Sequence, residues 1–180
     1  MIWICPSLAC TVGQAVHTLP ESQPVAGVTS LAGEIYVLRQ RERDQLEVYD
    51  VVTHRLNRHL TVPNAGLVID MASCDNYRCM YISDTNGECV HRIDVQARLF
   101  TRWLVQDQPW GLSVTGAHNI LVTCRSVRKI KEFSSHGDLL RALTLPGDVV
   151  NPWHAVLGRD DDFLLCHGRR GDAVHRMCVK

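Results

Sequence analysis

Four short apolar segments recur along the chain at nearly constant spacing, and this recurrence limits the folds that the chain can adopt. Their central residues are 45, 40 and 43 positions apart, at Tyr36, Tyr81, Leu121 and Leu164. A second segment follows each one, with markers 12 or 13 positions later at Tyr49, Ile93, Phe133 and Met177. Alternation of apolar and polar residues and short apolar runs are both typical of β-strands, and a helical chain has no reason to repeat such an offset.

Two further sets of segments complete the repeating unit. An outer set covers 14–20, 56–62, 99–105 and 139–145, and an opening set with Pro or Gly at its entry covers 25–31, 66–72, 110–116 and 153–159. Four strands in about 43 residues is the spacing of a β-propeller blade. A β-sandwich is the alternative, but a sandwich needs no matched offset across four units.

We therefore expect an all-β chain, a β-propeller with about four blades of four antiparallel strands. It is expected to form one domain over residues 1–180, with repeats near 1–23, 24–64, 65–108, 109–151 and 152–180. In this register the chain begins and ends within a blade, so we expect a part of a larger ring.

Composition excludes some classes of protein but does not indicate a binding partner. Hydrophobic residues make up 46% of the chain, which excludes a disordered protein, and 19 basic residues balance 19 acidic ones. The eight cysteines form no C-x-x-C pair and lie mostly in apolar stretches, so we expect reduced thiols in a cytoplasmic protein. No apolar run approaches the roughly 20 residues of a membrane span. No cofactor-binding motif occurs, so we expect no cofactor.

The repeats share an opening pattern. Pro24 and Gly27 precede an Ile-Tyr-Val strand at 35–37, and Pro109 and Gly111 precede an Ile-Leu-Val strand at 120–122. In the last repeat His154 stands where Gly is usual. These openings resemble the NHL-repeat family, the propellers at the C-terminus of many TRIM-type proteins. The resemblance covers about residues 14–179 and implies a six-bladed ring that serves as an interaction module, in a parent protein that carries ubiquitin transfer elsewhere.

Basic residues gather in three of the turns that join the second strand of a blade to the third. Those turns share one propeller face with the links between blades, where two tryptophans follow prolines. This face predicts a ligand-binding surface made of Arg39, Arg41, Arg43, Trp110, Arg125, Arg128, Lys129, Trp153, Arg169 and Arg170. Basic side chains beside aromatic rings suit an acidic peptide or single-stranded nucleic acid. The alternative is that the turns are merely exposed and that the tryptophans pack between blades.

The sequence patterns for catalysis or metal binding are weaker than the pattern for the basic ligand-binding surface. His91 and His175 occupy matching third-strand positions, with Cys89 and Cys178 nearby, but the shared repeat template explains that match, so we expect no metal site. Residues 160–162 are a run of Asp without EF-hand spacing, and no G-x-S-x-G elbow or P-loop occurs. The sequence therefore predicts a non-enzymatic scaffold for protein partners. RNA binding is the alternative, and a propeller hydrolase or lyase is the second alternative.

Overall fold

The computed structural model describes residues 24–39, 44–158, 162–169 and 171–178, and every regular element in these ranges is a β-strand. Blade 1 contains β1 (Val25–Leu31), β2 (Glu34–Arg39), β3 (Gln45–Asp50) and β4 (Leu56–Thr61). Blade 2 contains β5 (Val68–Cys74), β6 (Cys79–Asp84), β7 (Cys89–Asp94) and β8 (Leu99–Leu104). Blade 3 contains β9 (Pro109–Val114), β10 (Ile120–Cys124), β11 (Lys129–Phe133) and β12 (Leu139–Thr144). Blade 4 contains β13 (His154–Leu157), β14 (Asp162–His167) and β15 (Ala173–Cys178).

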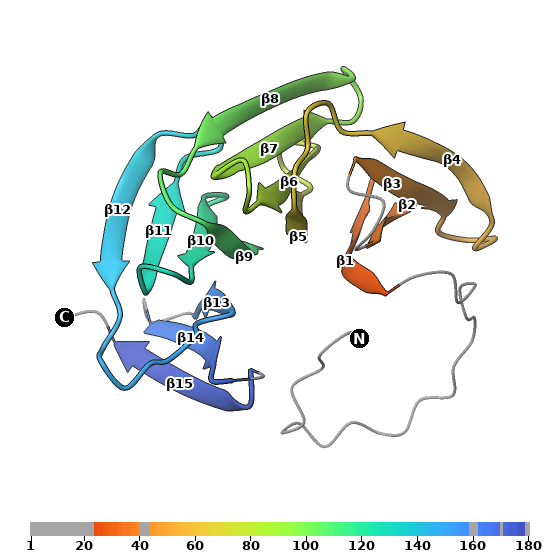
Figure 1. Cartoon of the computed structure of the whole chain (residues 1–180). Helices are drawn as coiled ribbons and strands as arrows, with labels where there is room; N and C mark the ends of the chain where they lie inside the picture. The colour runs from red at the N-terminus through yellow and green to blue at the C-terminus, as the bar shows by residue number, and fades with distance from the viewer. Residues whose placement is uncertain (1–23, 40–43, 159–161, 170, 179–180) are drawn as a thin grey trace.

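The four sheets stand side by side in an open arc (Figure 1). Within each sheet the strands pair antiparallel in chain order, so each blade is a simple meander. The first strands β1, β5, β9 and β13 contact one another at the centre, and β4, β8 and β12 form the rim. This arrangement is part of a β-propeller, which confirms the predicted fold class.

The strands lie within two residues of the predicted ranges wherever the structure describes them. The outer strand expected at 14–20 lies outside the described residues. In the described part of the chain no helix is long and apolar enough to cross a membrane.

The core lies between blades rather than within them. Three apolar clusters join blade 1 to blade 2, blade 2 to blade 3, and blade 3 to blade 4. The second strands of blades 2 and 3 are the most buried elements, since every residue of β6 and β10 is buried, whereas β4 is almost wholly exposed. In these two blades the second strands are short apolar runs because both of their faces are covered.

Tight turns join consecutive strands within the blades. In four hairpins the last residue of the turn, directly before the next strand, has positive φ. These residues are Arg78, Glu88, Arg98 and Arg128. A residue in the left-handed region completes a hairpin turn that follows the twist of its strands. The turn between β1 and β2 uses Ala32 and Gly33, with φ values of 52° and 80°.

Candidate functional site

One face of the arc carries the turns between second and third strands together with the links between blades, and we call it the turn face. Both kinds of connection lie on the same side because each blade is an antiparallel meander. The structure places four of the predicted basic residues there, all in blades 3 and 4, namely Arg125, Arg128, Lys129 and Arg169. Arg128 and Arg169 are exposed, and Arg125 and Lys129 are partly buried.

In blade 1 the structure buries Arg39, one of the predicted ligand-binding residues. Its side chain is only 4% exposed and forms an ion pair with Glu47 at 3.0 Å. Burial lowers the pKa of this guanidinium, but the Glu47 carboxylate outweighs burial and leaves the pKa above its ordinary value. The Arg39 side chain therefore links β2 to β3 through Glu47. Arg41, Arg43 and Arg170 lie outside the described residues.

Arg125 packs against two tryptophans from neighbouring blades. Its guanidinium carbon lies 4.6 Å from the ring centroid of Trp110 and 4.4 Å from that of Trp153, within the range of a cation–π contact. The two rings meet edge to face, with centroids 5.4 Å apart. The Trp153 Nε1–H donates a hydrogen bond of 2.9 Å to the Gly168 carbonyl oxygen. The tryptophans thus pack between blades 3 and 4, as the alternative prediction held, and they orient Arg125.

The hydrogen-bonding capacity of Arg125 is unused within the described part of the chain, where its guanidinium has ring contacts but neither hydrogen bond nor ion pair. An arginine presents five N–H donors in a planar fork that matches a carboxylate or a phosphate. A fork that aromatic rings already hold in place loses less side-chain entropy when it binds. This position is therefore suited to an anionic group.

The charge of the turn face is mixed. Asp107, Asp148, Asp172 and Glu88 lie on the same face as the basic residues. Asp107 forms an ion pair with the buried Lys131, whose Nζ also donates to the Val105 carbonyl oxygen at 2.7 Å. The face thus offers individual basic groups rather than a uniformly positive field.

A second group of polar side chains joins the inner strands of three blades. His154 Nδ1 lies 3.1 Å from Asp70 Oδ2, although the two residues are 84 positions apart. The same carboxylate oxygen accepts a hydrogen bond of 2.9 Å from the backbone N–H of Leu112. The side chains remain partly open, at 40% exposure for His154 and 23% for Asp70.

The glycine between these strands makes the contact feasible. A Cβ on Gly111 would lie 2.3 Å from the Trp153 carbonyl oxygen and 2.8 Å from the Cα of His154. Because β9 has no side chain at this position, Asp70 of β5 and His154 of β13 can meet beside it. A histidine held by a carboxylate at Nδ1 is an arrangement that can accept or donate a proton at Nε2.

The sequence indicated one of these two residues, His154, but not the other. His154 departs from the glycine that the repeat pattern predicts, and that departure marked the last repeat as unusual. Asp70 was missed because its partner lies two blades away, and linear spacing does not report such a contact.

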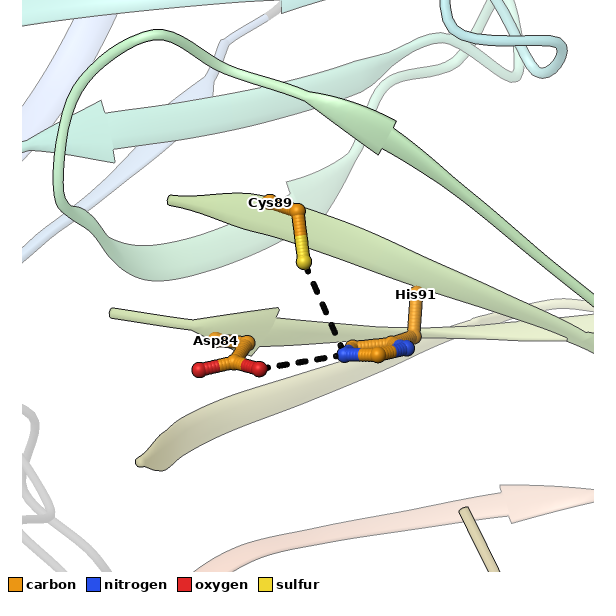
Figure 2. A group of neighbouring side chains, drawn as sticks. All are labelled: Asp84, Cys89 and His91. Atoms are coloured by element: carbon orange, nitrogen blue, oxygen red, sulfur yellow. Dashed lines mark hydrogen bonds and ion pairs between the residues drawn. The ribbon is translucent and has the colours of Figure 1, made fainter. Parts of the chain in front are cut away.

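A third group is buried in the hairpin between β6 and β7 (Figure 2). Asp84, Cys89 and His91 each offer one ligand atom, and these atoms lie within 4.8 Å of one another. His91 Nε2 is 3.2 Å from Asp84 Oδ2 and 3.6 Å from Cys89 Sγ. All three side chains are buried.

Asp84 also holds the backbone at the turn face. Its Oδ2 accepts a hydrogen bond of 2.7 Å from the Gly66 N–H, and its Oδ1 accepts one of 2.9 Å from the Gly87 N–H. Burial raises the pKa of this carboxyl, but the two backbone donors and His91 outweigh burial and hold the pKa below its ordinary value. Burial, followed by the charge of Asp84, raises the pKa of the Cys89 thiol.

From the sequence, Cys89 and His91 lie near each other in one repeat, but the repeat template explains their positions and no metal site is expected there. Asp84 was the missing member, because it lies on the preceding strand and only the hairpin pairing brings it opposite Cys89.

An open groove of about 410 Å³ lies elsewhere, between β4 and the turn that joins β7 to β8. Its lining includes Arg58, Leu60, Asp94 and Phe100. None of the predicted ligand-binding residues lines it, so it is separate from the turn face.

Comparisons with known proteins report a shared fold. No protein-family model matches the chain, and no curated protein matches it. Streptogramin B lyase aligns with a TM-score of 0.69 at 15% identity, over 85% of this chain and 51% of the lyase. Virginiamycin B lyase from Staphylococcus aureus gives 0.69 at 13% identity, over 85% and 52%. The WD40 repeats of RRP9 give 0.69 at 13% identity, over 84% of this chain and 47% of that one.

The chain thus spans about half the length of these solved structures. The expectation of a non-enzymatic protein is wrong as an inference from this fold, because the same fold occurs in a lyase. The NHL-specific resemblance has no matching family model, whereas the broader β-propeller assignment agrees with these neighbours. The chain is therefore similar in fold to β-propellers that include both enzymes and WD40-repeat proteins.

Proposed function

We propose that this protein is a binding module that recognises an acidic segment of a protein partner on the turn face of blades 3 and 4. The observation that carries the proposal is the position of Arg125, which two tryptophans orient and whose N–H groups have no partner among the described residues. The resemblance of the blade openings to NHL repeats supports the same role.

The energetic argument concerns a charge-assisted pair at a partly buried site. A carboxylate that meets a guanidinium fork forms two parallel hydrogen bonds, which are stronger than neutral ones. Arg128, Lys129 and Arg169 lie on the same face and add attraction for a segment with several acidic residues. One oriented anchor with weaker basic neighbours is the usual distribution of energy in a protein interface.

The mixed charge of the face favours a peptide over RNA. A surface that follows a phosphate backbone needs basic groups at repeated positions and few acidic ones. Here Asp148 and Asp172 are exposed on the same face as the basic residues. Such acidic groups repel a polyanion, whereas a protein segment that carries isolated carboxylates can avoid them.

The test is a binding titration with a fluorescent peptide of alternating Glu and Ser, beside the same peptide with Gln in place of Glu. We expect the acidic peptide alone to bind, and Arg125→Gln to weaken it about tenfold or more. Arg55→Gln serves as the matched control, because Arg55 is exposed in the turn that joins β3 to β4, on the opposite face. Thermal unfolding of each variant verifies that it remains folded.

Equal affinity of the wild-type protein and Arg125→Gln for the acidic peptide would contradict the proposal. A mixed single-stranded RNA pool, titrated at two salt concentrations, separates the alternative. Salt-sensitive RNA binding that requires Arg125, without peptide binding, would replace the peptide proposal with RNA binding.

A further inference from the structure

We propose that Asp84, Cys89 and His91 bind a single zinc ion in the β6–β7 hairpin of blade 2. The three residues supply one carboxylate oxygen, one sulfur and one imidazole nitrogen, which are the donor types that zinc takes in proteins. This site is distinct from Arg125 and does not depend on the proposed peptide binding.

The spacing of the donor atoms agrees with tetrahedral coordination. Zinc bonds of about 2.0–2.1 Å to nitrogen, 2.0–2.2 Å to oxygen and 2.3 Å to sulfur give edges of about 3.3–3.5 Å for N···O and about 3.6 Å for N···S. The distances from His91 Nε2 are 3.2 Å to Asp84 Oδ2 and 3.6 Å to Cys89 Sγ. Both edges that meet at His91 are therefore close to those of a tetrahedral site, and the third edge, from Asp84 to Cys89, is no longer than 4.8 Å.

The hairpin geometry explains why the donors converge. Cys89 and His91 are two residues apart on β7, so their side chains leave the same side of the strand. Asp84 pairs directly with Cys89 across the hairpin, at the end of β6. Figure 2 shows the three side chains directed toward one another from these two strands.

The backbone around Asp84 prepares it as a ligand. The N–H groups of Gly66 and Gly87 fix the carboxylate from two sides, as partners outside the coordination sphere do in metal sites. A Cβ on Gly87 would lie 2.7 Å from Asp84 Oδ2 and 3.1 Å from Cys89 Sγ. A side chain larger than hydrogen at this turn would therefore displace two of the proposed ligands.

Charge balance favours the ion in a buried site. Among the described residues, His91 is the one ionisable side chain that forms a hydrogen bond or ion pair with the buried Asp84 carboxylate. When Zn²⁺ binds, the Cys89 thiol releases its proton to solvent, and the thiolate and the carboxylate together offset the two positive charges. A neutral cluster is less costly to bury than an uncompensated charge.

Zinc suits this donor set better than calcium or magnesium, which require mainly oxygen ligands. Among the described residues the group contains three such donors, so the fourth position is left to a water molecule.

The experiment is a titration of the metal-free full chain with Co²⁺, followed by Zn²⁺. Cobalt bound to a thiolate gives a near-ultraviolet charge-transfer band that zinc removes when it displaces cobalt. We expect the band to saturate at one equivalent, to disappear in Cys89→Ser, and to require about tenfold or more cobalt in His91→Asn, because a lost ligand weakens the site. Circular dichroism identifies any variant that fails to fold.

The matched control is Cys74→Ser, because Cys74 lies 3.9 Å from His118 Nδ1 and forms a Cys–His pair outside the three-donor group. This variant is expected to keep the full band. The absence of a band in the folded wild-type protein would overturn the proposal, even if no variant folds. A band that persists in Cys89→Ser but vanishes in Cys74→Ser would also overturn it.

Discussion

At the scale of single residues, the blades bury most of their charge in pairs. Four buried charged side chains of the described chain have an ion-pair partner, namely Arg39, Lys131, Glu132 and Asp162. The buried Asp84 carboxylate lies beside His91, and that contact is an ion pair only when the imidazole is protonated. Breaking one partner would leave a buried charge without compensation, which is far more costly than losing an exposed pair. A basic residue at the end of a strand, such as Arg39, can therefore serve the sheet rather than a ligand.

The pair between Glu34 and Arg58 gives a pH dependence that can be measured. The hydrogen bond from Arg58 holds the pKa of Glu34 below its ordinary value of 4.5, and the Tyr36 hydroxyl donates to the same carboxylate at 2.7 Å. A carboxyl whose pKa is lower in the folded state contributes stability above its unfolded pKa, and that contribution disappears as pH falls through the folded pKa.

We therefore expect urea unfolding of the wild-type protein to lose more stability between about pH 5 and pH 3 than unfolding of Glu34→Gln. The difference should amount to about 1 kcal/mol or less, because the Arg58 side chain is 42% exposed and solvent weakens the pair. Parallel pH profiles for the two proteins would show that Glu34 contributes no such linkage.

At the scale of elements, neighbouring inner strands approach closely where a glycine removes the side chain. Gly27 of β1 faces Met71 of β5, where a Cβ would lie 2.9 Å from the Met71 side chain. The glycine of β9 faces the backbone of β13 at still shorter distances. Backbone atoms cannot move aside as a flexible side chain can, so the second contact is the stricter one.

Gly111→Ala is expected to destabilise the protein by about 1–3 kcal/mol or more, because the added methyl group would overlap the Trp153 carbonyl oxygen and separate β9 from β13. Gly116→Ala is the matched control in the following turn, where nothing lies within 4 Å of the added Cβ. Urea unfolding measures both variants. Equal urea midpoints for the two variants would mean that β9 and β13 accommodate the added methyl group.

At the scale of the whole molecule, each blade is stabilised by its neighbours. The four central residues of the sequence repeat illustrate this. Tyr36, Tyr81 and Leu121 are buried between blades, whereas the equivalent Leu164 of blade 4 is 43% exposed. Val156 and Val174, the neighbouring apolar residues of β13 and β15, are also exposed. The same sequence position thus differs in burial according to whether another described blade covers it.

This difference predicts unequal costs for the same substitution. Leu121→Ala should lower the free energy of unfolding by about 2–5 kcal/mol, because Leu121 is packed between blades 3 and 4. Leu164→Ala should lower it by less, about 1 kcal/mol, because Leu164 is already 43% exposed to water. Chemical denaturation compares the two. A large loss in Leu164→Ala would indicate that the exposed face of blade 4 is covered in solution.

Much of the architecture follows from the sequence alone. The alternation of Leu46, Val48 and similar positions predicts strands, and the constant offset between paired segments predicts repeated hairpins. These are local properties, because a strand's pattern depends on which of its faces is covered and a hairpin joins adjacent segments. Trp110, Trp153 and Arg125 could also be assigned to one face, since the meander determines the side on which each turn emerges.

The tertiary structure alone decided which polar side chains meet. Asp70 reaches His154 because a glycine separates their strands, and Asp84 faces Cys89 because of the hairpin register. Arg39 pairs with Glu47, whereas Arg125 packs against tryptophans, although both lie where a second strand meets its turn. The physical reason is that repeat spacing specifies backbone position, whereas the environment of a charged group depends on side chains from other strands and blades.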